Sequence, residues 1–276
     1  MIIKKETITS KSNPSVGFLS SLSEKKYRER YGMFRTDGIK LARELLERGI
    51  TPETLYIKES SADKIIAELA GFSSDAVILS DALFDRVSEE KSPEGVICII
   101  KHLDNLKKIA TIYNSEDFPQ GWRTDRIMLL ESLRDPGNLG TVIRSAAALS
   151  MERLIISADS AELYNPKTVR ASMGTLFGMN IDIVDSLPRA AETLKVLGRR
   201  VFAAALDREA VGLDSLTLRE TDCFAVGNEG HGLSEELLEV STGKVFIPIT
   251  EGAESLNAAA AAAILLWEHR RQTVKK

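Results

Sequence analysis

The chain has 276 residues, of which 43% are hydrophobic, and its formal net charge is −4 at pH 7. This length and composition allow a substantial core in one large or two modest domains, and they exclude a largely disordered chain. The sequence opens without a charged and apolar leader, and its longest apolar run, residues 258–267, is too short to cross a bilayer. We therefore expect a cytoplasmic protein that does not contact membranes.

Positive charge is concentrated near the amino-terminal end. Residues 1–50 carry a net charge of +5, which leaves −9 for the rest of the chain. Three aromatic residues, Tyr27, Tyr31 and Phe34, lie among the basic residues of this region. Positive charge that neutralises phosphates, combined with flat rings, is typical of RNA-binding surfaces, although a solvated amphipathic helix is an equal alternative. The candidate RNA-binding residues are Lys25, Lys26, Arg28 and Arg30.

Helical and strand patterns alternate in the first part of the chain. Helices are predicted over residues 38–48, 62–70 and 82–87, and strands over 54–57, 76–79 and 95–100. Such alternation predicts a small layered α/β domain, which we place at residues 1–103. Residues 104–124 lose the periodic pattern and become polar, so we expect a linker there.

A second α/β pattern fills residues 125–276. Strands are predicted over residues 127–130, 153–156, 180–184, 200–204, 223–226 and 244–248, and helices over 140–150, 167–174, 190–197 and the end of the chain. Helices that separate short apolar strands predict a mostly parallel sheet. Ligands of such sheets bind at the carboxyl ends of the strands, so the loops that follow the strands are the places to look for a site.

Three of these loops have an unusual composition. The first spans Asp135–Gly140 and leads into a helix that carries Arg144, and the second spans Gly227–Gly232. The third runs from residue 248 through Ser255 to Asn257 and enters an alanine-rich helix. Taken singly, each loop could be ordinary turn chemistry, and Ser255 or Asn257 could simply cap the last helix. The first loop lacks the fingerprints of dinucleotide-binding and P-loop proteins.

Taken together and in order, residues 135–144, 227–233 and 247–257 resemble the three motifs of the SpoU, or TrmH-like, RNA methyltransferases of the SPOUT superfamily. Residues 13–38 are similar to the amino-terminal RNA-binding extension of this family, so the resemblance covers nearly the whole chain. It implies an α/β fold with a carboxyl-terminal parallel-sheet domain that contains a deep trefoil knot, a rare feature in proteins. It also implies a smaller L30e-like α/β domain before it.

The function implied by the resemblance is methylation of a ribose 2′-hydroxyl in structured RNA, with S-adenosylmethionine as the methyl donor. The two-domain layout favours 23S ribosomal RNA as the substrate. The alternatives are a transfer RNA 2′-O-methyltransferase, a non-catalytic RNA-binding assembly factor, and a small-molecule-binding α/β protein whose loops match by accident. The family also forms homodimers through the carboxyl-terminal domain, and the alanines at 258–263 would permit close helix packing there.

The resemblance assigns roles to individual residues. The candidate catalytic residues are Arg144, Asn138, Glu229, Ser255 and Asn257, and the candidate cofactor-binding residues are Gly227, Asn228, Gly230, Ile247 and Leu256. Glycines suit such loops because main-chain groups without a Cβ can approach a ligand closely. A guanidinium stays protonated in proteins, so we expect Arg144 to bind a phosphate and stabilise a developing alkoxide, not to act as a base.

The remaining chemistry-bearing residues indicate no metal site. Cys98 and Cys223 lie in apolar stretches and are expected to be buried, unreactive thiols. The three histidines, His102, His231 and His269, are too scattered to form a metal site with neighbouring ligands.

Overall fold

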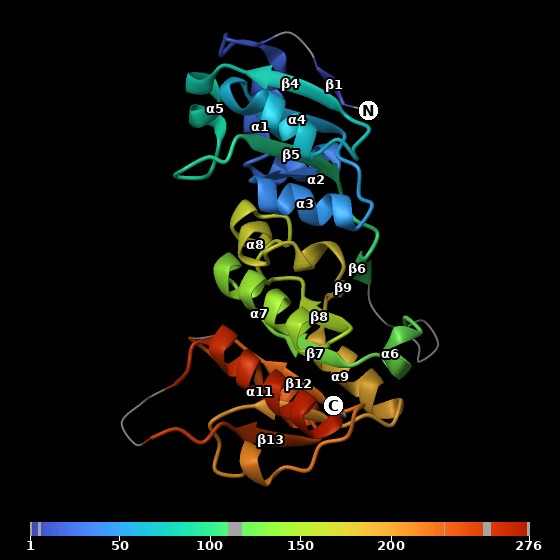
Figure 1. The fold of residues 1–276 in the computed structure, drawn as a ribbon. Coiled ribbons are helices and arrows are strands. Elements are labelled where there is room, and N and C mark those ends of the chain that lie inside the picture. Colours follow the sequence, from blue (N-terminus) through green and yellow to red (C-terminus); the bar gives the residue numbers. More distant parts are fainter. Residues whose placement is uncertain (1, 5–6, 110–117, 229, 251–254, 275–276) are drawn as a thin grey trace. The chain divides into compact units, whose positions relative to one another are not determined.

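The computed structural model describes residues 2–4, 7–109, 118–228, 230–250 and 255–274 (Figure 1). They form two compact units. The amino-terminal unit comprises residues 1–103 and 162–178, and the carboxyl-terminal unit comprises 104–161 and 179–276. Segment 162–178 lies inside the predicted carboxyl-terminal domain, yet it packs with the amino-terminal unit. Among the described residues, no helix is both long and apolar enough to cross a membrane.

The amino-terminal unit is built on a five-stranded sheet in the order β1-β4-β3-β5-β2. Its strands are β1 (Ile3–Lys4), β2 (Met33–Asp37), β3 (Thr54–Lys58), β4 (Asp75–Leu79) and β5 (Val96–Lys101), and its helices are α1 (Pro14–Ser21), α2 (Lys25–Tyr31), α3 (Ile39–Glu47), α4 (Ala62–Glu68), α5 (Asp81–Val87) and α8 (Pro166–Ala171). β1, β4 and β3 are parallel, whereas β5 runs antiparallel to both β3 and β2. The sequence patterns did not predict α1 or the edge strands β1 and β2.

Helices cover both faces of this sheet. Side chains of successive strand residues point to opposite faces. Tyr56 and Ile97 pack with Leu19 of α1 and Phe84 of α5 in one buried cluster. Helices α3 and α4 pack against β5 and β3. Cys98, the next residue along β5, is buried as expected, and burial raises the pKa of its thiol to about 12.

Arg28 joins segment 162–178 to the rest of the amino-terminal unit. Its Nε donates to Glu162 Oε1 at 2.8 Å, a second guanidinium nitrogen donates to Glu162 Oε2, and Nη1 donates to the carbonyl oxygen of Leu22 at 2.7 Å. The Arg28 side chain is only 2% exposed. The prediction that Arg28 binds RNA was therefore wrong, because its guanidinium is already bonded within the unit. Phe34 is also buried, and the centroid of its ring lies 4.4 Å from the centroid of the Tyr164 ring.

The carboxyl-terminal unit contains an eight-stranded sheet in the order β11-β13-β10-β12-β7-β8-β9-β6. Its strands are β6 (Leu106–Ile109), β7 (Ile127–Leu130), β8 (Arg153–Ser157), β9 (Asn180–Val184), β10 (Val201–Ala204), β11 (Val211–Gly212), β12 (Cys223–Val226) and β13 (Gly243–Phe246), and its helices are α6 (Gly121–Thr124), α7 (Pro136–Ala148), α9 (Leu187–Val196), α10 (Glu235–Val240) and α11 (Ala258–Thr273). Neighbouring strands are parallel throughout, which confirms the predicted parallel sheet.

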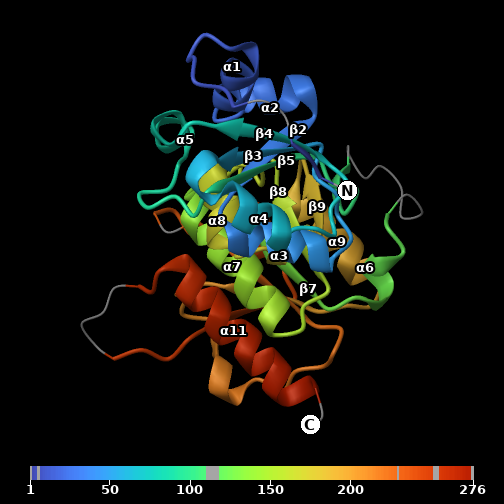
Figure 2. The ribbon, with the colours of Figure 1, turned by 45° about the horizontal axis from the view of Figure 1, so that its top comes forward.

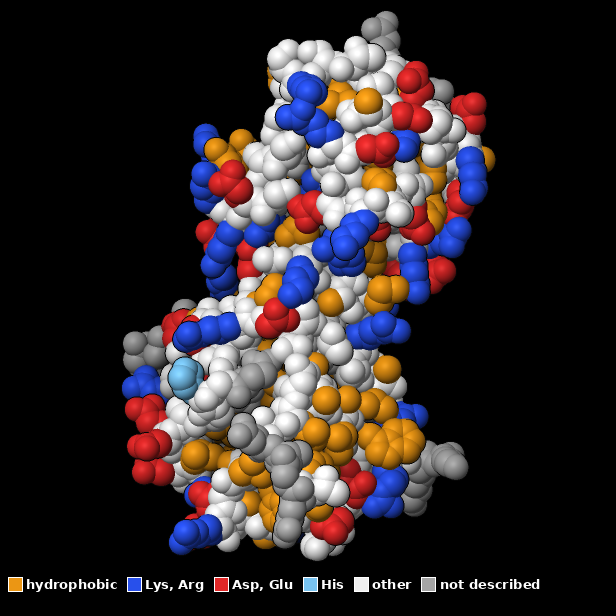
Figure 3. Space-filling view, turned by 90° about the vertical axis from the view of Figure 1, so that its left-hand side faces the viewer, with side chains coloured by type: hydrophobic (Ala, Val, Ile, Leu, Met, Phe, Trp, Pro, Cys, Tyr) orange, Lys and Arg blue, Asp and Glu red, His pale blue; other side chains and the backbone are white. Residues whose placement is uncertain are grey.

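Two helix layers enclose this sheet (Figures 1 and 2). Leu194 of α9 and Leu237 of α10 pack in one cluster with Cys223 and Ala225 of β12. Phe224 points to the opposite face, where its ring contacts that of His269 on α11, and α11 packs along α7. Cys223 is buried as expected, and burial raises the pKa of its thiol to about 11. Figure 3 shows hydrophobic side chains gathered on one face of this unit.

Part of the stretch predicted as a linker is regular structure. β6 pairs with β9 at the edge of the large sheet, and α6 buries Trp122, whose indole Nε1 donates to Asp182 Oδ2 at 2.7 Å. These contacts are made with residues far along the chain, so local composition did not reveal them. The short helix α10 was also absent from the predicted elements. Residues 110–117 lie outside the described part of the chain.

The ion pair of Arg28 generates a stability prediction. Arg28→Ala leaves the Glu162 carboxylate without its buried partner, and we expect the free energy of unfolding to fall by about 3 kcal/mol. Urea denaturation of the whole chain measures this change. Lys26→Ala is the matched control, since the Lys26 side chain is 66% exposed and an exposed ion pair contributes less than about 1 kcal/mol. Equal effects of the two substitutions would contradict the assigned role of Arg28.

Candidate active site

The first of the three predicted loops follows β7 and turns directly into α7. The Asp135 side chain accepts a hydrogen bond from the Asn138 main-chain N–H at 2.8 Å, and Pro136 occupies the first helical turn. An acidic cap followed by proline is a strong start signal for a helix. For this reason α7 begins at Pro136 and not at residue 140, where we had predicted it, and Asn138 lies in its first turn.

The second loop follows β12 and closes tightly on itself. The main-chain N–H of Asn228 donates to the Gly232 carbonyl oxygen at 3.1 Å, and the Gly232 N–H donates back to Asn228 at 2.8 Å. A Cβ on Gly227 would lie 2.3 Å from the Gly232 carbonyl oxygen, so this buried position requires glycine. The Asn228 side-chain Oδ1 accepts from the Gly230 N–H at 2.8 Å. Glu229 lies outside the described residues.

Two sets of hydrogen bonds join the residues directly after β7 to the second loop and to the start of α10. Glu131, which is 8% exposed, accepts from the Ser234 main-chain N–H at 2.7 Å and from the Ser234 hydroxyl at 2.8 Å. The Asn228 Nδ2 donates to the Ser132 carbonyl oxygen at 2.9 Å. The two loops meet because β7 and β12 are neighbours in register, with Leu130 opposite Val226. The carboxyl ends of both strands therefore lie at the same edge.

Residues at and after the end of β8 hold Ser132 in place. Ser132 has a φ of 51°, a conformation that costs energy for a residue with a side chain. Its N–H donates to Ser157 Oγ at 2.7 Å, and its hydroxyl donates to Asp159 Oδ2 at 2.6 Å. Burial raises the pKa of Asp159, but hydrogen bonds from Ser132 and Ser157 and the nearby Arg134 outweigh it and lower the pKa. Asp159 therefore accepts these bonds as a carboxylate.

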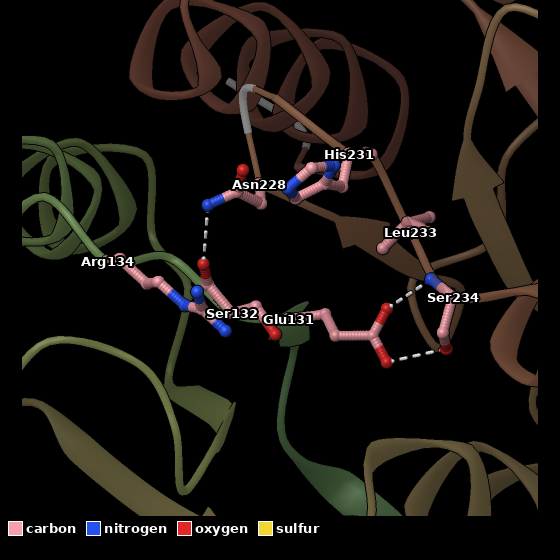
Figure 4. A pocket seen from close by; sticks show the side chains of 8 residues that line it. Glu131, Ser132, Arg134, Asn228, His231, Leu233 and Ser234 are labelled. Atoms are coloured by element: carbon pink, nitrogen blue, oxygen red, sulfur yellow. Dashed lines mark hydrogen bonds between the residues drawn. The ribbon is translucent and has the colours of Figure 1, made fainter.

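A pocket of about 190 Å³ opens between the segments that follow β7 and β12 (Figure 4). The buried Glu131 carboxylate forms its floor, and the exposed Arg134 and His231 flank it with charged or ionisable groups. Of the residues predicted to bind the cofactor, only Asn228 lines this pocket. The lining residues are Glu131, Ser132, Arg134, Asn228, His231, Gly232, Leu233 and Ser234.

The third loop reaches the first loop through two asparagines. Asn257 caps α11 by accepting from the N–H groups of Ala259 and Ala260 at 2.9 Å and 3.3 Å. Its Nδ2 also donates to the Asn138 Oδ1 at 3.1 Å. Asn257 therefore caps the last helix, as the simpler interpretation of this residue predicted, and two predicted catalytic residues from distant parts of the chain lie in contact.

The remaining predicted site residues of this unit differ in how far they are exposed. Arg144 is exposed on α7, and within the described residues its side chain has no hydrogen bond or ion pair. Ile247 and Leu256 are half-buried, while Ser255 and Gly230 are exposed. None of these residues lines the pocket in Figure 4.

The predicted RNA-binding residues all lie on α2 of the amino-terminal unit. Lys25, Lys26 and Arg30 are exposed on α2, as an RNA-binding surface requires, whereas Arg28 is buried. Sequence reasoning missed Glu131, Ser132, Ser234 and Asp159. One signal could have found Glu131, Ser132 and Asp159, since polar residues that follow adjacent parallel strands gather at the same edge of a sheet.

Family descriptions and known relatives match almost the whole chain. The SpoU rRNA Methylase family matches residues 125–267, and the MRM3-like substrate binding domain matches residues 13–98. Among curated relatives, the 23S rRNA (guanosine(2553)-2'-O)-methyltransferase RlmP of Bacillus subtilis (strain 168) is 31% identical over 95% of this chain and 98% of its own length.

Solved structures share the fold over a similar span. The crystal structure of an RNA 2'-O ribose methyltransferase matches with a TM-score of 0.80 and 28% identity, covering 97% of this chain and 99% of its own. The AdoMet-bound rRNA methyltransferase from Sinorhizobium meliloti matches with a TM-score of 0.79 and 26% identity, covering 96% and 97%.

The contact between Glu131 and Ser234 generates a second stability prediction. Glu131→Gln keeps the side-chain volume, but one end becomes an NH2 group that cannot accept from Ser234. Loss of a hydrogen bond to a charged acceptor should lower the free energy of unfolding by about 2 kcal/mol. Thermal and urea denaturation measure the loss. The control is Glu192→Gln on α9, where the carboxylate is exposed and the same change should be close to neutral. An unchanged unfolding midpoint in Glu131→Gln would show that the bonds between the loops contribute nothing.

Proposed function

The chain belongs to the SpoU rRNA methylase family of S-adenosylmethionine-dependent 2′-O-methyltransferases, and from this premise we propose that it methylates a ribose 2′-hydroxyl of 23S ribosomal RNA. One observation carries the proposal beyond family membership. Asn138 and Asn257, which come from the first and third loops, lie in direct contact at 3.1 Å. The proposed cytoplasmic location rests on the sequence prediction.

The proposed cofactor site consists of Gly227, Asn228, Gly230, Ile247 and Leu256. Ile247 and Leu256 are half-buried, so each keeps part of an apolar side chain open to a flat purine ring. The glycines permit close approach of main-chain groups, which supports hydrogen bonding to a polar ligand. When bound, S-adenosylmethionine supplies the methyl group, and the residues of the chain position the ribose.

The reaction requires the 2′-oxygen to be held in line with the donor and to lose its proton. Positioning meets the first requirement, and electrostatic stabilisation of the charge that develops on the oxygen assists release of its proton to water. We assign Arg144 to binding a phosphate next to the target ribose and to stabilising negative charge on the oxygen, because its guanidinium is exposed and remains charged. Asn138 and Asn257 orient the ribose from the opposite loops. Ser255 and Glu229 are assigned to the same site by the family motif.

The amino-terminal unit is proposed to bind the RNA. We assign to it the L30e-like architecture, and we assign phosphate binding to Lys25, Lys26 and Arg30, which are exposed. The match of residues 13–98 to a substrate binding domain supports this role.

The carboxyl-terminal end of the chain is proposed to pass through a deep trefoil knot. Family membership supports this. A crystal structure in which the chain path from β12 to α11 is traced without a break tests the knot.

A homodimer is proposed through α11. Ile264 and Trp267 are 39% and 57% exposed, and with Ala260 their spacing places them on one side of the helix. Large apolar side chains exposed together are typical of an interface. A second copy of the chain that packs on this stripe would bury them.

Methyl transfer tests the proposed function directly. Purified protein, labelled S-adenosylmethionine and total RNA from a strain that lacks the gene should give label in 23S ribosomal RNA, at one 2′-O-methylated, alkali-resistant linkage. Label in transfer RNA alone would overturn the choice of substrate. The absence of any transfer, together with intact RNA binding, would favour a non-catalytic assembly factor.

Arg144→Ala should lower the rate of methyl transfer a hundredfold or more, roughly the effect of removing one donor that stabilises a developing oxyanion. The affinity for S-adenosylmethionine, measured by calorimetry, should stay nearly unchanged. Arg189→Ala on α9 is the matched control, since Arg189 is also exposed. Normal turnover by Arg144→Ala would remove this residue from the mechanism.

Trp267→Glu should convert the dimer into a monomer, because a charge within the stripe resists burial. Sedimentation velocity at micromolar concentration measures the change in mass. Val196→Glu introduces the same charge at an apolar residue of α9 that is 74% exposed, and it should leave the dimer intact. A wild-type chain that sediments as a monomer would refute the proposed interface.

A further inference from the structure

A strip of three aromatic rings runs across α1 and α2, which lie side by side in the amino-terminal unit (Figure 2). The ring of Tyr31 meets that of Phe18 edge-on at 5.2 Å between centroids, and it lies 6.2 Å from Tyr27 with an angle of only 12° between the planes. Phe18 packs against the buried core of the unit, which fixes one end of the strip. Tyr31 is 41% exposed and therefore presents much of its ring to solvent.

Two cations lie over these rings. Lys26 Nζ is 4.8 Å from the centre of the Tyr27 ring, and the Arg30 guanidinium is 5.7 Å from the centre of the Tyr31 ring. Lys26 also pairs with Glu24 at 2.8 Å, and Lys25 pairs with Glu29 at 3.8 Å. Exposed pairs of this kind contribute little and exchange readily for other partners. The strip thus combines aromatic rings that are fixed by packing with positive charges that can bind phosphates.

The geometry points to a specific occupant. We propose that Tyr31 and Tyr27 form a stacking platform for unpaired nucleotides of the RNA substrate, while Lys25, Lys26 and Arg30 bind the adjacent phosphates. The faces of paired bases are covered by their neighbours in a duplex, so only unpaired bases can stack on an exposed ring. This inference rests on the proposed function, and it adds that the amino-terminal unit selects single-stranded RNA, such as a loop, over duplex RNA.

Arg28 is excluded from the platform by its position. Although it belongs to the same basic run, it points into the unit and pairs with Glu162, so it takes no part in the platform. The conformation of α2 therefore divides the basic run into one structural residue and three that face the RNA.

Fluorescence anisotropy with the full chain tests the platform. The probes are a labelled oligoadenylate of about twelve nucleotides, which fits the known range of single-strand site sizes, and a blunt RNA duplex of the same length. Tyr31→Leu removes the ring and keeps an apolar side chain, and it should weaken binding of the oligoadenylate about tenfold. Tyr31→Phe keeps the ring and should bind within about twofold of the wild type, since stacking does not need the hydroxyl. Binding of the duplex should be the same in all three proteins.

Salt dependence separates stacking from charge. Lys25→Ala should reduce the slope of log affinity against log salt by about 0.7, as expected for one lost phosphate contact on a single strand. Tyr31→Leu should leave this slope unchanged. The thermal unfolding midpoint of Tyr31→Leu should match that of the wild type if the substitution acts through RNA alone.

Three results would overturn the platform. They are unchanged affinity of Tyr31→Leu for the oligoadenylate, equal losses for oligoadenylate and duplex, and a wild-type chain that prefers the duplex. Affinity for S-adenosylmethionine should be normal in Tyr31→Leu. Failure of the wild type to transfer methyl groups would instead refute the proposed function, so the two failures are distinguishable.

Discussion

The rest of the candidate site depends on the hydrogen bonds that the Glu131 carboxylate accepts from Ser234. This carboxylate lies at the end of β7, is buried, and accepts two hydrogen bonds from Ser234 at the start of α10. A buried carboxylate needs such partners, because an unsatisfied charge away from water is costly. The Asn228 bond to the Ser132 carbonyl adds a second connection. Together they fix the loop that carries Gly227, Asn228 and Gly230 relative to the segment that leads to Asn138.

The parallel arrangement of the strands explains why the bonds of Glu131 can hold several loops together. Strands β12, β7 and β8 are adjacent, so the loops that follow them emerge at the same edge of the sheet. Residues separated by most of the domain then become neighbours, and a few hydrogen bonds are enough to hold them. Asp159 and Ser157 extend the network to β8 by holding Ser132 in a strained conformation. Backbone strain held by surrounding contacts is common at functional sites.

In the amino-terminal unit, helix α2 carries both residues that stabilise the fold and residues that are proposed to bind RNA. The basic and aromatic run of α2 contains residues of two kinds, because a helix distributes neighbouring side chains over different faces. Arg28 faces inwards and holds segment 162–178, whereas Lys25, Lys26 and Tyr31 face solvent. Segment 162–178 comes from the middle of the family domain, yet it packs with the amino-terminal unit. Its function there is therefore partly structural.

Periodic local patterns in the sequence determined the alternating α/β fold, the parallel sheet of the carboxyl-terminal unit and the motif loops that mark the family. They did not determine β6, the pairing of Arg28 with Glu162, or the contact of Asn257 with Asn138, since each joins residues far apart in the chain. Basic residues look alike in a sequence, so only their packing could separate buried Arg28 from exposed Lys26. Glu131 was overlooked for the same reason, because a carboxylate acquires its role from the Ser234 that the fold brings to it.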